Sequence, residues 1–161
     1  MPLDDQQTLA LLRDLDDPDH VEFPRNYDHA ATRARFDQLA ATLDQRFRCT
    51  CSVDRDVQDA SHYGSMAVPG TATAGGHHIA VRVSKFGNLV AVTLVNPGSQ
   101  DGEEEGVRFE SADRRRIDDV LEALGYITVP ERLLRARYDG VTSLGSYFDP
   151  PTWWHRFFYH L

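Results

Sequence analysis

The sequence predicts a single α+β domain in which an antiparallel three-stranded meander packs against helices. Apolar residues recur at helical spacing over residues 36–47 and again over 112–124, whereas they alternate with a period of two between about 57 and 95. Helical segments on either side of one block of strands are typical of the α+β class. At 161 residues, with 41% hydrophobic and 26% charged residues, the chain has the size and composition of one globular domain.

Residues 1–56 are predicted to be mainly helical. A first helix covers 4–16 and ends before Pro18, because proline disfavours the helical conformation in the residue that precedes it. A second helix begins after Asn26 or Asp28, since both residue types cap helix N-termini. Its apolar stripe consists of Phe36, Leu39, Ala40, Leu43 and Phe47.

Residues 57–95 are predicted to form the sheet. A first strand runs through 57–68, and 81–94 form a hairpin around Gly87-Asn88, a pair that tolerates the positive φ of a tight turn. A two-residue loop at this point places Phe86 opposite Leu89, Ser84 opposite Ala91, and Arg82 opposite Thr93. The face that packs on the helices then carries Ile79, Val81, Val83, Val90, Val92 and Leu94.

Residues 96–161 are predicted to contain a helix, an extended return and an aromatic C-terminal segment. The helix covers about 112–124, with Ser111 as its cap and Gly125 just beyond its end. It is expected to pack beside the second helix on the apolar face of the sheet. Residues 126–131 form a short strand or extended return, and 131–150 are expected to be irregular.

The last eleven residues, PTWWHRFFYHL, contain five of the aromatic side chains of the chain. In a helix, Trp153, Trp154, Phe157, Phe158 and Leu161 form one wide apolar face, with His155, Arg156, Tyr159 and His160 largely opposite. Five large apolar side chains left in water would promote association. We therefore expect this segment to close the core, and the alternative is a surface for a partner or for a second copy of the chain.

The formal net charge of −8 argues against nucleic acid as a partner, because binding phosphates requires clustered lysine and arginine. It favours basic partners instead. No apolar run approaches the roughly 20 residues that span a bilayer, and the acidic N-terminus lacks the features of a signal peptide, so a cytoplasmic location without membrane binding is expected. Cys49 and Cys51 fit a reducing compartment and are expected to be reduced and structural.

Catalytic and metal-binding motifs such as HExxH, paired CxxC, GxSxG and GxxxxGK[ST] do not occur in the sequence. His77 and His78 are neighbours that point to opposite faces if they lie in a strand. The two cysteines have no evident third ligand. We therefore expect no catalysis, no cofactor and no metal. The alternative is a small cytoplasmic enzyme whose site is assembled from His62, His77 and His78 with nearby acidic or cysteine residues.

An acidic run within the predicted loop 96–106 is the candidate partner-binding site. It comprises Asp101, Glu103, Glu104 and Glu105. The run is either a solvated loop or a docking site for a basic partner. Oxygen ligands also suit Ca²⁺ and Mg²⁺, but the spacing does not match a calcium-binding loop.

Four segments carry a resemblance to a known group of proteins: VRVSKFGNLVAVTLVNPG, SADRRRIDDVLEALGYITVPE, YDGV and PTWWHRFFYHL. Together they cover about residues 57–161 and resemble small actinobacterial immunity-protein-like members of polymorphic toxin systems. The shared features are structural and include no catalytic signature. The resemblance implies an inhibitor that binds a cognate, basic toxin stoichiometrically. An enzyme and a homodimeric structural domain are the competing interpretations.

Overall fold

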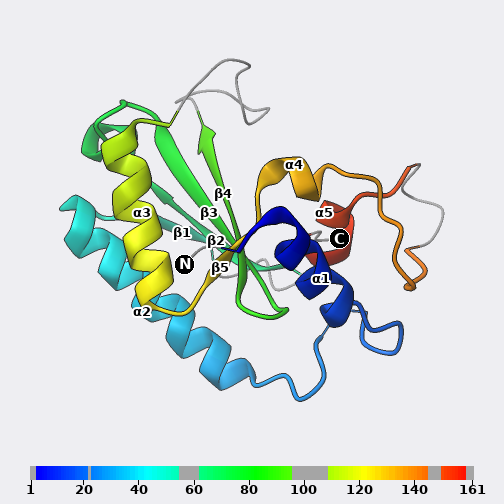
Figure 1. Cartoon of the computed structure of the whole chain (residues 1–161). Coiled ribbons are helices and arrows are strands. Elements are labelled where there is room, and N and C mark those ends of the chain that lie inside the picture. The colour runs from blue at the N-terminus through cyan, green and yellow to red at the C-terminus, as the bar shows by residue number, and fades with distance from the viewer. Residues whose placement is uncertain (1–2, 22, 55–61, 96–108, 145–149, 159–161) are drawn as a thin grey trace.

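The computed structural model describes residues 3–21, 23–54, 62–95, 109–144 and 150–158, and it confirms the α+β class (Figure 1). The helices are α1 (Asp5–Leu15), α2 (His29–Phe47), α3 (Ser111–Ala123), α4 (Glu131–Leu134), α5 (Trp153–Phe157) and the 3₁₀ turn η1 (Gly70–Ala72). The strands are β1 (Ser52–Asp54), β2 (His62–Val68), β3 (His78–Ser84), β4 (Leu89–Val95) and β5 (Ile127–Thr128). No helix among the described residues is both long and apolar enough to cross a membrane.

The five strands form one sheet in the order β1-β2-β3-β4-β5, so the predicted limit of three strands is wrong. The meander β2-β3-β4 is present, but β1 adds an antiparallel strand at one edge and β5 adds a parallel strand at the other. The edge strand β1 has three residues, which is too short for an alternating pattern to reveal it, whereas β5 lies within 126–131, where a short strand or extended return is predicted. The part of the predicted first strand before His62 lies outside the described residues.

The hairpin between β3 and β4 turns at Gly87-Asn88, as predicted. Both residues have positive φ, of 55° and 59°, and the Leu89 N–H donates to the Phe86 carbonyl at 3.0 Å. The predicted pairs beyond the turn are wrong, because Arg82 lies opposite Ala91 and not opposite Thr93. Ser84, Lys85 and Phe86 lie between the turn and Val83, the last paired residue of β3, whereas Leu89 alone lies between the turn and its partner Val90. The β3 side of the hairpin is therefore two residues longer than the β4 side. A shift of two residues leaves the alternation of faces unchanged, so the predicted apolar face is correct.

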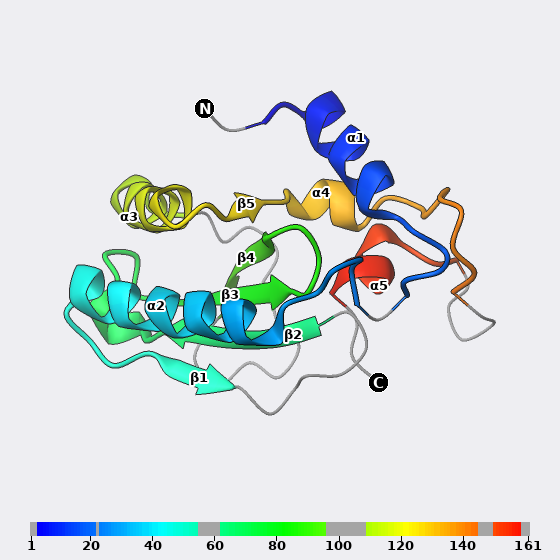
Figure 2. The ribbon, with the colours of Figure 1, turned by 90° about the horizontal axis from the view of Figure 1, so that it is seen from below.

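Helices α2 and α3 pack against that apolar face and enclose the larger core (Figure 2). Gly125, with φ of 80°, follows the end of α3 as expected, whereas Ser111 is the first helical residue and Glu110 occupies the cap position. Val92 is partly buried against this core. The predicted core residues Phe36, Leu43, Ile79, Val81, Val83 and Leu94 are at most 9% exposed, and so are Val120 and Leu121 of α3.

A second core lies on the other face of the strands, where α1, α4 and α5 meet. It is formed around Leu12, Phe86, Leu89, Leu134 and Trp153. Helix α4 occupies part of the stretch predicted to be irregular, so that prediction is wrong there. A single helical turn shows little periodicity in the sequence. The second core joins the N-terminal helix to the C-terminal segment.

Trp153, Phe157 and Phe158 are buried in the second core and the partly buried Trp154 packs against it, which confirms for the described residues that this segment closes the core. Trp153 stacks on Phe157 with ring centroids 6.0 Å apart, and Trp154 stacks on Phe158 at 5.3 Å. The prediction was wrong for Arg156, which is 1% exposed and points inward. Its Nε donates to a carboxylate oxygen of Asp16 at 2.7 Å. Residues 159–161 lie outside the described part of the chain.

Candidate functional site

The acidic residues predicted to bind a partner, Asp101, Glu103, Glu104 and Glu105, lie outside the described residues. The described chain ends at Val95 before this run and resumes at Phe109 after it. The run therefore stays a prediction.

The three histidines considered for an enzyme site are not brought together. His62 lies opposite Ser84 in the pairing of β2 with β3, whereas His78 begins β3, six residues before Ser84. At about 3.3 Å per residue, His62 and His78 are separated by roughly 20 Å along the sheet. His77 directly precedes β3, at the end of the strand distant from His62.

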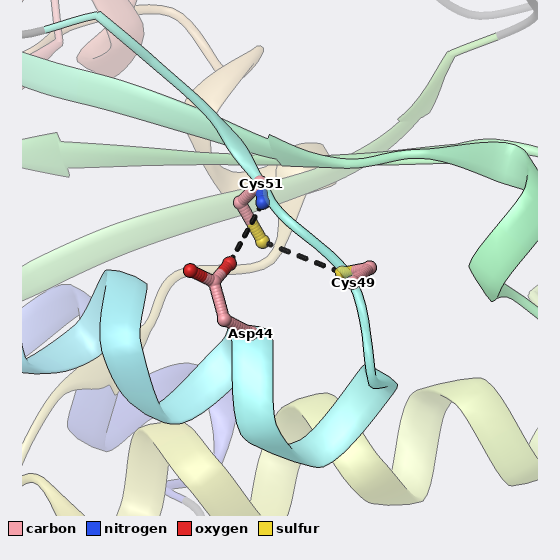
Figure 3. A group of neighbouring side chains, drawn as sticks. All are labelled: Asp44, Cys49 and Cys51. Carbon is pink, nitrogen blue, oxygen red and sulfur yellow. Dashed lines mark hydrogen bonds between the residues drawn. The ribbon is translucent and has the colours of Figure 1, made fainter.

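Asp44, Cys49 and Cys51 form a compact group, here called the thiol–carboxylate cluster (Figure 3). One ligand atom from each of the three residues lies within 4.8 Å of the others, and the two sulfur atoms are 4.0 Å apart. A disulfide bond would require about 2.05 Å, and both cysteines are free thiols. It is the single group of this kind among the described residues, and it contains no histidine.

The cluster is produced by the way in which α2 ends. Arg48 adopts the left-handed conformation, with φ of 53° and ψ of 54°, and reverses the chain. The N–H groups of Arg48 and Cys49 both donate to the Asp44 carbonyl, which caps the helix. The chain then runs back beside the last turn, and the Cys51 N–H donates to Asp44 Oδ1 at 2.7 Å. This hydrogen bond fixes the carboxylate beside the thiols.

The electrostatics of the cluster keep the thiols protonated when no cation is present. Burial raises the pKa of Cys51 well above its ordinary value, and the Asp44 carboxylate raises it further. Burial also raises the pKa of Cys49, although the contact with Cys51 offsets part of the effect. Because the thiolate is the nucleophilic form, neither cysteine is activated for nucleophilic catalysis.

Asp44 is the member of the cluster that sequence reasoning missed. The pattern D-x₄-C-x-C carries all three residues, but the contact depends on a left-handed reversal at Arg48. Glycine is the usual residue at such a reversal, so an arginine at this position gave no signal. The sequence showed no third donor group beside the cysteines, whereas the fold places the Asp44 carboxylate there.

An aromatic recess of about 510 Å³ lies between the N-terminal connection and the β3–β4 hairpin. Phe23, Tyr27, His29 and Lys85 line it. The Lys85 ammonium lies over the Phe23 ring, 4.3 Å from its centroid, and the lysine is 6% exposed. Burial raises the pKa of Tyr27. This cation–π contact holds the connection between α1 and α2 on the hairpin, which is a structural role.

Comparisons with family models, with curated proteins and with solved structures found no match for this chain.

Proposed function

We propose that this protein is a non-catalytic protein-binding module that engages a basic protein partner. More specifically, we propose an immunity-type inhibitor that neutralises a cognate toxin by stoichiometric binding. The observation that supports this proposal best is the uneven distribution of charge along the chain.

The described part of the chain is close to neutral. It holds 17 of the 25 acidic residues and 15 of the 17 basic residues, which gives it a net charge of −2. The remaining residues therefore carry a net charge of −6. Residues 96–108 alone contain four carboxylates and one arginine. This segment therefore carries a net charge of −3, against −8 for all 161 residues.

Many carboxylates of the described part are already paired with arginines on the surface. The pairs include Asp5–Arg132, Arg13–Asp139, Arg46–Asp119, Arg114–Asp118 and Glu131–Arg135. Charge that is balanced locally contributes little to the field at a distance, whereas an unbalanced run of one sign steers oppositely charged partners. Such steering acts mainly on the association rate. The run Asp101–Glu105 is therefore the part of the sequence best suited to attract a basic protein.

The test compares two variants with the same net charge of −4. The loop variant carries Asp101→Asn, Glu103→Gln, Glu104→Gln and Glu105→Gln. The control variant carries Asp118→Asn, Asp119→Asn, Glu131→Gln and Asp139→Asn, all from surface ion pairs. The partner to be tested is the protein encoded by the neighbouring reading frame.

We expect a 1:1 complex by light scattering, and relief of that protein's toxicity on co-expression. Association of the loop variant should be about 10-fold slower or more at low ionic strength, with a weaker dependence on salt. The control variant should associate at close to the wild-type rate. Equal association rates for the two variants would assign the effect to total charge and would rule out the acidic run as the docking site. The absence of a complex would refute the proposal for this partner.

A further inference from the structure

The thiol–carboxylate cluster has the donor atoms and the spacing of a site for a soft or borderline metal ion. Two sulfurs bound to one Zn²⁺ at about 2.3 Å, with a tetrahedral angle between them, lie about 3.8 Å apart. The sulfurs of Cys49 and Cys51 are 4.0 Å apart in this structure. The cluster is therefore close to the zinc-bound spacing without any movement of the backbone.

The carboxylate of Asp44 is oriented to supply a third ligand. Its Oδ1 accepts the hydrogen bond from the Cys51 N–H and lies on the side of the two sulfurs, whereas Oδ2 points away from them (Figure 3), so the second lone pair of Oδ1 is the donor available to a cation. Zinc–oxygen and zinc–sulfur bonds at a tetrahedral angle place the two donor atoms about 3.6 Å apart. All three ligand atoms already lie within 4.8 Å of one another. A displacement of the donor atoms by about 1 Å, through side-chain rotation, therefore brings them to the spacing of zinc ligands.

The surroundings of the cluster also favour a cation. It lies at the C-terminal end of the 19-residue helix α2, where the helix dipole is negative. The backbone N–H that fixes Asp44 acts as the supporting hydrogen bond that metal-binding carboxylates usually have. Cys51 is buried, whereas Cys49 and Asp44 are partly exposed, so an ion could enter from solvent on their side.

We propose that Asp44, Cys49 and Cys51 bind one Zn²⁺ ion per chain, with the fourth coordination position open to solvent. Zinc accepts the mixed sulfur and oxygen set, whereas calcium and magnesium prefer oxygen ligands alone. This site is independent of the proposed protein binding, because it lies at the end of α2 and uses none of the acidic residues of the 101–105 run.

The first experiment uses the full chain, kept reduced with a phosphine and titrated with Zn²⁺ against a chromophoric chelator. We expect one equivalent to bind. Co²⁺ in place of Zn²⁺ should produce sulfur-to-cobalt charge-transfer absorption and the intense visible bands of tetrahedral coordination. This spectrum is recorded on the wild-type protein, so it does not depend on the folding of any variant.

The variants are Cys49→Ser, Asp44→Asn and the control Asp119→Asn. Changes even in the supporting shell of a metal site reduce affinity about 10–100-fold, so loss of the Cys49 sulfur should reduce zinc affinity at least about 100-fold. Asp44→Asn retains an acceptor for the Cys51 N–H and should reduce affinity about 10-fold or more. Asp119 lies in an exposed ion pair, and its variant should bind as the wild type does.

Three results would overturn the proposal. The first is Zn²⁺ binding that survives unchanged in a Cys49→Ser, Cys51→Ser double variant, which would place the ion elsewhere. The second is a Co²⁺ complex without sulfur charge-transfer absorption. The third is the absence of stoichiometric binding to the reduced wild-type protein.

Discussion

Arg156 connects the C-terminal helix to the N-terminal part of the chain, and its removal is the sharpest test of the second core. Its side chain is fully buried, and the Asp16 side chain with which it pairs is 2% exposed. The guanidinium also donates to the carbonyls of Asp17, His20 and Val21, at 3.3, 3.1 and 3.1 Å. It lies over the rings of two buried phenylalanines. One side chain therefore satisfies four acceptors from residues 16–21.

The expected cost of Arg156→Met follows from what the change leaves behind. Asp16 would keep its hydrogen bonds from Tyr138 and Thr142, at 2.5 and 2.6 Å, but its buried charge would lose its counterion. Removing one partner of a buried ion pair costs about 3–5 kcal/mol. For a chain of this size, 1 kcal/mol corresponds to about 2–4 °C in melting temperature. The melting temperature should therefore fall by about 6–20 °C.

The assay is a thermal melt followed by circular dichroism, with Arg132→Met as the matched control. Arg132 pairs with Asp5 at the surface, where an ion pair contributes about 0–1 kcal/mol, so this control should lose at most about 4 °C. The double variant Asp16→Asn, Arg156→Met removes both charges and should be more stable than Arg156→Met alone. The reasoning is refuted if Arg156→Met melts within 4 °C of the wild type, or if the double variant is the less stable of the two.

Three further predictions concern the same region. Truncation after Pro151 removes the buried side chains of Trp153, Phe157 and Phe158. Loss of each such side chain costs about 3–5 kcal/mol, against a total stability of about 5–15 kcal/mol, so the truncated chain should show no cooperative melt. Near-normal melting would show that the segment is dispensable for the core. Gly140→Ala should lower the urea midpoint of unfolding strongly, because a Cβ at this position overlaps the Asp16 carboxylate. The control Gly75→Ala, whose Cβ has its nearest contact at 3.4 Å, should unfold close to the wild-type midpoint. Equal midpoints for the two variants would contradict this packing. Burial raises the pKa of Asp16, but its hydrogen bonds outweigh this effect and hold the pKa below 3.8. The contribution of Asp16 to the free energy of unfolding is therefore present above pH 3.8 and is lost as the pH falls through the lowered pKa. The stability of Asp16→Asn should accordingly fall less steeply with acid than that of the wild type, and equal slopes would show that Asp16 is not responsible.

The first core could be predicted from the sequence because each of its elements carries its own periodic signal. The apolar stripe of α2 and the alternation in β3 and β4 each extend over at least seven residues. The exact pairing of β3 with β4 could not be predicted. It depends on the accommodation of Ser84 and Lys85 beside the turn, where the Phe86 N–H donates to the Ser84 hydroxyl. Nothing in the local composition distinguishes that arrangement from a regular hairpin.

The second core and the thiol–carboxylate cluster could not be predicted fully, because both depend on contacts that local patterns do not encode. An arginine normally points to solvent, and only the folded chain places Asp16 opposite Arg156, 140 residues away. In the same way, the approach of Asp44 to the cysteines depends on one backbone reversal at Arg48. The sequence correctly predicted free thiols at Cys49 and Cys51 and an aromatic segment that closes the core, but not the polar residues that lie against each of them.

The two cores also differ in how far apart along the sequence the elements that form them lie. Most of the first core is built from α2 and the β2–β4 meander, whose elements follow one another in sequence. The second core requires α1 and α5, whose residues are more than 130 positions apart, so closing it carries the larger loss of chain entropy. The buried Asp16–Arg156 pair makes this closure specific, because a guanidinium buried without its carboxylate would be strongly unfavourable. The pair therefore favours one arrangement of the chain ends over other ways of burying the same aromatic residues.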